Sequence, residues 1–519
     1  MKQNFASNRR LRYGGISVIL TVLLIAAVVL LNALIGTLAK RYQWYHVMLT
    51  ERSYGVTGAC YDLLGAVFAA HEETDGQPPE VEIIFCDRPE NLMASATSSY
   101  IYQTACSLAE RYGNIRITCY DVWLNPEKVR PYMTTLAIDP TTGVEAEFDV
   151  TLKSTSLIIV SGSYHRVYAH TEFFVFEGGD TSKVWAYNGE KKLAAGILHA
   201  IDPDSPTVCL TNNHGEAYYD YEVLYLLDDA GYRLNYIDLT QSPIPANCDL
   251  ILCFNPNKDL AVPNELAEVS EPDILDAFLA VQGHSFLVFL ENGTPSLPNL
   301  EAYLETWGVS ACYFNSANGN RYRYMVQDSS GSLTSDGYTI YGTAQTSGKS
   351  GELLAGLTRN AVFKNATALR VASGFRPNGD GSYTYGDKTL YSLYETGSSA
   401  VAWANGSAVD SNGMMLMTVT EQAVEGGVSR VGVVSSVRFA SEEFLQSAVY
   451  GNSDSFLRVL RIFGRTPTPE GLTIKPFQST DMSLVTTTQK RNWTIFLALL
   501  PALAVTAIAV PILVRRRYA

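Results

Sequence analysis

Two long apolar segments without a charged residue, one near each end, most strictly limit what this chain can fold into. Residues 14–39 read GGISVILTVLLIAAVVLLNALIGTLA, and as a helix they extend about 39 Å, more than the roughly 30 Å apolar core of a bilayer. Residues 493–514 read WTIFLALLPALAVTAIAVPILV. The segment contains two prolines, which a transmembrane helix tolerates because neighbours in the bilayer or a local distortion can satisfy the backbone carbonyl that each proline frees. The sequence therefore predicts two transmembrane helices.

Basic residues set the expected orientation of both helices. Arg9, Arg10 and Arg12 precede the first, and the arginines at 515–517 follow the second. Basic clusters favour the cytoplasmic side, so residues 1–13 and 515–519 are expected to be cytoplasmic tails. The first apolar core is too long for a cleaved signal peptide, which favours an uncleaved signal anchor. We expect a cell-membrane protein with two spans and a large extracytoplasmic domain between them.

Charge is distributed unevenly along the chain. The overall charge is −14, and the segments 1–41 and 490–519 together carry eleven lysines and arginines with no acidic residue, which leaves −25 on the middle. So acidic a body repels phosphate backbones, and we expect no nucleic-acid partner. The eight cysteines show no spacing typical of zinc sites, and their even number leaves disulfides open without indicating a pairing.

The segment after the first span predicts an α/β domain over residues 42–200. VEIIFCD and NIRITCYDVW are typical of buried strands, and a helical stretch near SSYIYQTACSLAERYG separates them, which indicates a β–α–β unit with a parallel pair. STSLIIVSGSYHRVYAH indicates a strand and a hairpin, and GEKKLAAGILHAI indicates a helix. A proline-rich linker follows at 202–206.

Residues 205–465 predict a second α/β domain. PTVCLT, DLILCFNP, SFLVFLENG and SRVGVVSSVRF read as strands, with helices indicated at EPDILDAFLAVQGH and SDSFLRVLRIFG. Alternation of this kind predicts mostly parallel sheets covered on both faces. Residues 320–410, rich in Gly, Ser, Thr and Tyr, predict a β-rich insertion, and residues 466–492 a stalk. The expected fold class is thus two outer α/β domains plus two terminal transmembrane helices.

A polar loop after the first strand of the second domain is the best candidate for a binding site. Open α/β sheets bind ligands at this edge, and Asn213, His214, Gly215 and Glu216 lie in the loop. A His–Glu pair can hydrogen-bond a polar ligand or share a proton. In the alternative interpretation, the asparagines and His214 shape the turn and Glu216 favours the next helix N-terminus.

Other chemical signals are weak, and we expect no catalytic residue, cofactor or metal. Cys253 ends a buried strand, but Phe254, Asn255 and Pro256 follow instead of the glycines of a nucleophile elbow. The stretch at 342–350 has one residue too many for a phosphate loop. No G-x-S-x-G occurs, and the other histidines form no metal spacing.

The order of features resembles the gliding-motility-associated auxiliary family of ABC transporters. The matching pieces are LTERSYGVTGACYDLL, NGEKKLAAGILHAI, TNNHGE, DLILCFNPNKDLAVPNE, LPNLEAYLETWGV, SRVGVVSSV, GNSDSFLRVL and the closing arginines. The T-G-H-G-E usual in that family appears at residues 211–216 one residue longer and without its first glycine. The resemblance implies a non-enzymatic, substrate-contacting subunit that works with a separate permease and a cytoplasmic ATPase. It also implies that the second domain is similar to the class I glutamine amidotransferase fold without its catalytic apparatus.

Two other functions stay open at this point. One is an envelope-facing ectoenzyme, a hydrolase of envelope polymers that uses the loop of His214 and Glu216. The other is an adhesin or sensor whose β-rich insertion contacts other cells or polymers. The partners expected from the sequence are the permease and ATPase subunits, membrane lipid, and an envelope polymer or polar ligand.

Overall fold

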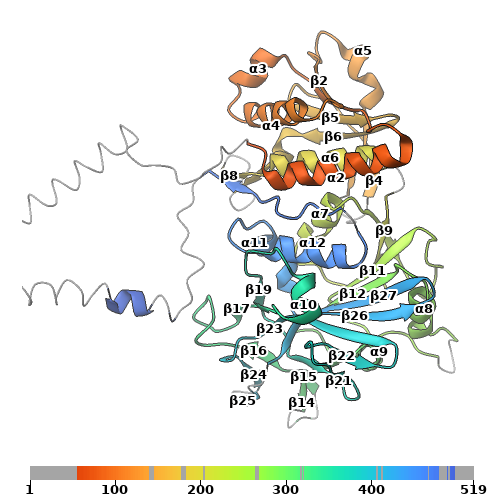
Figure 1. The fold of residues 1–519 in the computed structure, drawn as a ribbon, viewed down its shortest axis with the longest axis vertical. Coiled ribbons are helices and arrows are strands. Elements are labelled where there is room, and N and C mark those ends of the chain that lie inside the picture. Colours follow the sequence, from red (N-terminus) through yellow and green to blue (C-terminus); the bar gives the residue numbers. More distant parts are fainter. Residues whose placement is uncertain are drawn as a thin grey trace, which may run out of the picture. The chain divides into compact units, whose positions relative to one another are not determined.

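The structure is a computed structural model of the 519-residue chain. It describes residues 55–139, 145–176, 183–202, 205–263, 268–315, 318, 321–404, 407–410, 413–465, 467–477, 488 and 491–496. Helices and strands alternate through these residues, which confirms the α/β class (Figure 1).

The first sheet has four strands in the order β2-β1-β5-β6. They are β1 (Val81–Phe85), β2 (Ile115–Cys119), β5 (Ser156–Ser161) and β6 (Tyr164–Ala169). Strands β1 and β2 are parallel, whereas β5 runs antiparallel to β1 and forms a hairpin with β6. The β–α–β unit and the hairpin predicted from the sequence are therefore confirmed.

Three helices share a core with this sheet: α2 (Gly58–Asp75), α4 (Ser98–Arg111) and α6 (Gly189–Ile201). Helix α2 begins where the Thr57 side chain accepts a hydrogen bond from the Cys60 N–H, the usual way of satisfying a free amide in a first turn. Helix α6 passes so close to the sheet that a Cβ on Gly196 would lie 2.5 Å from Ile159 Cδ1. A Cβ at this position would therefore displace the Ile159 side chain.

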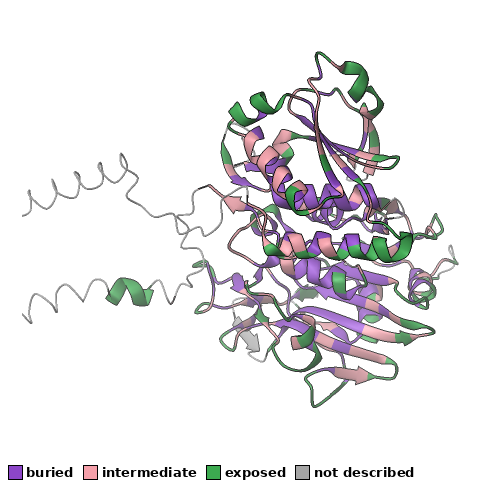
Figure 2. Cartoon of the chain, turned by 45° about the horizontal axis from the view of Figure 1, so that its top comes forward, coloured by how far each residue is buried: buried purple, intermediate pink, exposed green. Residues whose placement is uncertain are grey.

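The second sheet follows the order β10-β9-β11-β12-β27-β26-β23-β22-β21. Its first five strands are β10 (Arg233–Ile237), β9 (Thr207–Thr211), β11 (Cys248–Phe254), β12 (Ser285–Phe289) and β27 (Gly427–Val434). All four pairings among these five are parallel. Helices α7 (Glu222–Asp229) and α12 (Asn452–Ile462) share a core with one face, and α8 (Glu271–Leu279) and α9 (Pro298–Thr306) with the other. Both faces are thus buried, as Figure 2 shows by the purple strands.

The prediction of mostly parallel sheets is wrong for the rest of the molecule. Strand β26 (Met415–Val424) makes a hairpin with β27, and β23 (Lys388–Glu395), β22 (Tyr383–Tyr385) and β21 (Arg376–Pro377) continue antiparallel from it. The β26–β27 reversal is local, because Gly426 at φ 87° provides the tight turn directly after β26. The pairing of β26 with β23 joins segments that lie apart in the sequence. Among the described strands, parallel pairing is confined to five neighbouring strands and the β1–β2 pair.

The region predicted as a β-rich insertion, 320–410, is composed largely of short strands in its described part. They are β15 (Arg321–Arg323), β16 (Met325–Gln327), β17 (Thr339–Tyr341), β18 (Thr343–Ala344), β19 (Val362–Lys364), β20 (Leu369–Val371), β24 (Val401–Ala404) and β25 (Ser407–Asp410), besides β21–β23. One short helix, α10 (Gly348–Leu353), interrupts them. Because β21–β23 extend the large sheet, this region shares a core with the second domain.

Among the residues that the structure describes, no helix combines the length and the apolar character that crossing a bilayer requires. The first predicted span, 14–39, lies outside the described residues, and so does all of the second except 493–496. Those four residues are helical, and Trp493, Ile495 and Phe496 are at least half exposed. Both spans stay predictions, as do the domain boundaries.

The first described residues of the chain, from Gly55, contact a segment near residue 475. Strand β28 (Lys475–Pro476) pairs with β8 (Val184–Tyr187), which in turn pairs with β7 (Phe174–Phe176). The Glu190 carboxylate accepts hydrogen bonds from the Thr57 N–H (2.7 Å) and hydroxyl and lies 2.7 Å from Lys475 Nζ. Lys475 Nζ also donates to the Gly55 carbonyl. We call Gly55, Thr57, Glu190 and Lys475 the entry–exit cluster.

Candidate functional site

The loop singled out in the sequence lies at the carboxyl edge of the parallel strands. It begins after Thr211, the last residue of β9, and α7 begins only at Glu222. Strand β11 lies beside β9 in the same direction, so the loop that follows Phe254 is its neighbour. This is the edge at which open α/β sheets usually bind ligands.

His214 is enclosed between two carboxylates and is only 2% exposed. Its Nδ1 lies 3.0 Å from Glu216 Oε1, and its Nε2 lies 2.9 Å from Glu271 Oε2. An ionised carboxylate can only accept hydrogen bonds, so both ring nitrogens act as donors, and the imidazolium form satisfies both. The ring therefore has no free nitrogen for a ligand when it is protonated.

The two carboxylates are fixed by further donors. Glu216 accepts from the Thr211 hydroxyl and from the His214 backbone N–H at 3.0 Å. Glu271, the first residue of α8, accepts from the Ala261 N–H at 2.6 Å and from Asn213 Nδ2 at 2.7 Å. The alternative placement of Glu216 at the N-terminus of the following helix is wrong, because Glu216 precedes α7 by six residues and folds back onto His214.

The turn between the histidine and the glutamate needs glycine. Gly215 has φ 68°, a left-handed conformation that residues with a Cβ rarely adopt. The His214 carbonyl accepts from the N–H groups of Asn257 (2.8 Å) and Lys258 (2.7 Å), and Asn257 Nδ2 donates to the Gly215 carbonyl. These bonds tie the β9 loop to the loop after β11. Asn213, His214, Gly215 and Glu216 are thus brought together as a closed, internally bonded turn.

Electrostatics favour the charged form of each member. Burial alone would lower the pKa of His214, but hydrogen bonds with Glu216 and Glu271 raise it to about 9. Burial would raise the pKa values of Glu216 and Glu271, but their hydrogen bonds with His214 lower both. Near neutral pH the cluster is therefore an ion triplet with one positive and two negative charges.

Cys253 also reaches this cluster. A ring nitrogen of His214, a carboxylate oxygen of Glu216 and Sγ of Cys253 all lie within 4.8 Å of one another. Cys253 is only 1% exposed. Burial raises the pKa of the Cys253 thiol far above its usual range, which makes it a poor nucleophile. The strained turn after β11 falls instead at Asn255, which has φ 52°. The position that an elbow would expose carries an asparagine.

Sequence reasoning missed two members of the cluster, Glu271 and Cys253. Glu271 is 57 residues from His214, and only the order of strands in the sheet brings α8 beside the β9 loop. The one signal present in the sequence was an acidic residue beside Pro272 at the expected start of a helix. Cys253 lies near the end of a buried strand, as the sequence predicts, but its proximity to His214 depends on the parallel pairing of β9 and β11.

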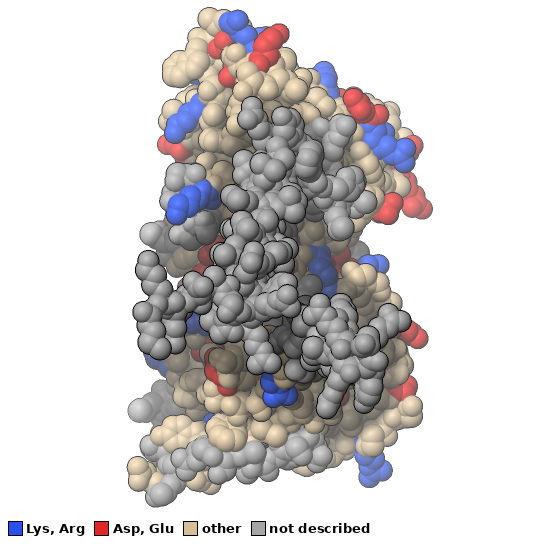
Figure 3. All heavy atoms as spheres, turned by 90° about the vertical axis from the view of Figure 1, so that its left-hand side faces the viewer, with Lys and Arg blue, Asp and Glu red and all other residues tan. Residues whose placement is uncertain are grey.

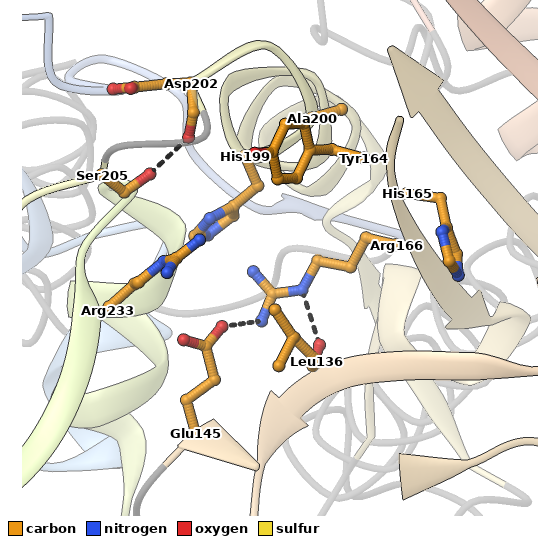
Figure 4. Close-up of a pocket in the computed structure, with 10 residues that line it drawn as sticks. All are labelled: Leu136, Glu145, Tyr164, His165, Arg166, His199, Ala200, Asp202, Ser205 and Arg233. Atoms are coloured by element: carbon orange, nitrogen blue, oxygen red, sulfur yellow. Dashed lines mark hydrogen bonds and ion pairs between the residues drawn. The ribbon is translucent and has the colours of Figure 1, made fainter. Parts of the chain in front are cut away.

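A buried ionic network joins the first sheet to α7. Arg166 on β6 contacts Asp228 at 2.7 Å. It also contacts Glu145 at 3.6 Å and donates to the Leu136 carbonyl at 2.9 Å (Figure 4). His199 lies 3.3 Å from Asp228. The cavity beside these side chains has about 40 Å³, room for a few water molecules at most. Its size argues against an organic ligand.

A larger hollow lies between β7, β8 and the short helix α11 (Glu442–Leu445). Its volume is about 490 Å³, and it combines apolar with acidic side chains. The lining residues are Val175, Trp185, Glu442, Glu443, Gln446, Ser447, Val449 and Tyr450. On the face drawn in Figure 3, acidic and basic side chains are interspersed where residues are described.

Comparison with known proteins adds little. No protein-family model matches the chain, and no curated protein matches it. Among solved structures, the mmIFT52 N-terminal domain is similar over 50% of this chain and 96% of its own, at 13% identity and a TM-score of 0.34. PurLQS from Thermotoga maritima is similar over 50% of this chain and 99% of its own, at 10% identity and a TM-score of 0.26. Scores this low carry no argument about fold or function.

Proposed function

We propose that this protein is a membrane-anchored, non-enzymatic auxiliary subunit of an ABC transporter, which works with a separate permease and a cytoplasmic ATPase. The resemblance of the sequence motifs to the gliding-motility-associated auxiliary family supports the class. The two predicted spans support the anchoring, and two helices are too few to form a pore without a partner.

The observation that carries the proposal is the entry–exit cluster. Glu190 binds Thr57, which lies 18 residues after residue 39, and Lys475, which lies 18 residues before residue 493. If two spans hold the body to one membrane, the segment that enters the body and the segment that leaves it must both reach that membrane. The contact between these two segments fits that requirement.

The closed site supports the non-enzymatic part of the proposal. His214 has both nitrogens bonded to carboxylates, and Cys253 is buried with a raised pKa, so neither group offers a free base or nucleophile. We further propose that the second domain is a relative of the class I glutamine amidotransferase fold in which Asn255 occupies the elbow. The hollow beside β8 is then a surface for contact with a partner or an envelope polymer.

Co-purification tests the proposal. The full chain, tagged at its C-terminus, is isolated from its native membrane in mild detergent, and the proteins recovered with it are identified by mass spectrometry. We expect one multi-span permease and one ATPase. The matched control replaces residues 493–514 by an alternating Leu–Ala span, which keeps the anchor and changes the partner surface, and it should recover less of both.

Two results would contradict the proposal. One is the recovery of neither permease nor ATPase with the native chain under conditions that preserve other transporters. The other is hydrolysis of envelope polymers by the purified chain with loss of that activity in His214→Ala, which would establish the ectoenzyme instead.

A further inference from the structure

We propose that His214, Glu216 and Cys253 form a binding site for one zinc-class divalent metal ion. The three side chains supply one nitrogen, one oxygen and one sulfur ligand, and these atoms lie within 4.8 Å of one another. Imidazole, carboxylate and thiolate are the three side-chain ligands that zinc uses in proteins. Two of the ligands come from the loop after β9, and the third comes from β11. The folded sheet brings them together, so no local spacing in the sequence predicts the site.

The surroundings of His214 match those of a metal-bound histidine. Such a histidine usually donates its second ring N–H to a carboxylate, which fixes the tautomer and the ring orientation. Here His214 Nδ1 lies 3.0 Å from Glu216 Oε1, while Nε2 lies 2.9 Å from Glu271 Oε2. Glu271 is itself held by the Ala261 N–H and by Asn213. Glu271 is therefore held in place beside His214 before any ion binds.

Binding of the ion exchanges it for protons. An ion held by His214 Nδ1 and by the Cys253 thiolate would displace the Nδ1 proton and the thiol proton, and both would leave to solvent. The two positive charges of the ion would replace those of the two protons, so binding would add no net charge to the protein interior.

Burial assigns the ion a structural role. The side chains of His214, Glu216 and Glu271 are at most 3% exposed, so a substrate has no access to an open coordination position. The fourth position would fall to the Thr211 hydroxyl, which already bonds Glu216, or to one water molecule. The ion would fasten the β9 loop to β11 at the carboxyl edge of the sheet. This inference stands apart from the transporter proposal, which requires no metal.

Metal content of the native protein tests the inference first. The full chain is purified in detergent without chelator, dialysed against metal-free buffer, and analysed by inductively coupled plasma mass spectrometry. We expect close to one zinc per chain. X-ray absorption at the zinc edge should show one sulfur at about 2.3 Å and nitrogen or oxygen ligands at about 2.0–2.2 Å. Less than about a tenth of an equivalent, after refolding with added zinc as well, would overturn the inference.

Matched cysteine variants locate the ion. Cys209 is also fully buried, on β9, but outside the cluster, so Cys209→Ser is the control for Cys253→Ser. Cobalt-loaded native protein and Cys209→Ser should show a thiolate-to-cobalt charge-transfer band, and Cys253→Ser should lack it. Equal bands in all three proteins would contradict the site. If Cys253→Ser fails to fold, the absorption spectrum of the native protein still decides, because it reports the sulfur directly.

A variant of Glu271, the carboxylate that bonds His214 Nε2, gives a graded readout. Glu271→Gln keeps the size of the side chain and removes the charge that orients His214, so we expect zinc affinity to fall about 10–100-fold while the cobalt spectrum keeps its sulfur band. Unchanged affinity in Glu271→Gln would contradict the assigned orientation of the ring.

Discussion

Lys475 Nζ lies 2.7 Å from the Glu190 carboxylate, although 285 residues of chain separate the two. Glu190 is almost fully buried and also binds Thr57, so a single carboxylate holds both the beginning and the end of the described body. The ammonium group also donates to the Gly55 carbonyl. Glu190 is the second residue of helix α6, and later residues of α6 pack in the core of the first sheet, so the contact couples both segments to that core.

Removing one partner of this pair should destabilise the protein strongly. Glu190→Gln leaves the Lys475 ammonium, itself 15% exposed, without its anion, and the loss of a buried partner costs about 3 kcal/mol. Urea unfolding of the full chain in detergent, followed by tryptophan fluorescence, measures the change. In the double variant Glu190→Gln/Lys475→Met the loss should be smaller than the sum of the two single losses by about 1 kcal/mol or more. Strict additivity would show that the two residues do not interact.

The Arg166–Asp228 pair should matter more than ion pairs on the surface. Both side chains are at most 12% exposed, so Asp228→Asn leaves a buried arginine with only Glu145 opposite, and we expect a loss of about 3 kcal/mol. Arg88→Gln is the control, because Arg88 is 55% exposed in its pair with Asp121 and such pairs contribute at most about 1 kcal/mol. Equal losses in the two variants would contradict the burial of the network.

The same pair predicts a specific dependence of stability on pH. Burial would raise the pKa of Asp228, but Arg166 and His199 lower it below the value of about 3.9 in an unfolded chain. A lowered folded pKa adds stability that is fully present above the unfolded pKa and is lost as pH falls through the folded pKa. Urea unfolding at pH 7, 5, 4 and 3 should show a steeper loss below about pH 4 for the native chain than for Asp228→Asn. Parallel curves would rule out this contribution.

Individual elements were predictable where a short stretch of sequence determines them. The runs DLILCF and SFLVF form β11 and β12, and EPDILDAFL forms α8, because continuous apolar runs and a proline near the helix start are local signals. The extension of the sheet was not predicted, because pairing of β26 with β23 depends on contacts between distant segments. Propensity and periodicity do not contain that information.

The candidate site was predictable only in part, for the same reason. A polar loop after a buried strand predicts that His214 and Glu216 lie at the carboxyl edge of the sheet, and the structure has them there. No local pattern indicates that both nitrogens of the ring are bonded to carboxylates. That outcome requires Glu271, which α8 brings to the loop, and α8 follows a different strand. Residues that meet at one edge of a parallel sheet come from separate loops, so their combination becomes visible only once the strand order is known.

The turn after β11 supports a last prediction, based on the two non-glycine residues with positive φ among those described. Asn255 has φ 52°, and its side-chain oxygen accepts a hydrogen bond from the Thr294 hydroxyl at 3.1 Å. Asn365, which is half-buried and has φ 56°, serves as the position for comparison. Asparagine tolerates this conformation better than other residues with a Cβ, and glycine tolerates it best.

Substitution at both positions separates conformation from hydrogen bonding. Alanine should be less stable than glycine by about 1 kcal/mol at position 255 and at position 365, because the backbone cost is the same. Asn255→Gly should itself lose about 1 kcal/mol relative to the native chain, since Thr294 then lacks its acceptor, and Asn365→Gly should lose little. Urea unfolding of the four variants measures both differences. If alanine and glycine were equally stable at 255 but not at 365, the turn after β11 would not have the strained geometry of an elbow, and the proposed relation of the second domain to the amidotransferase fold would lose its main structural support.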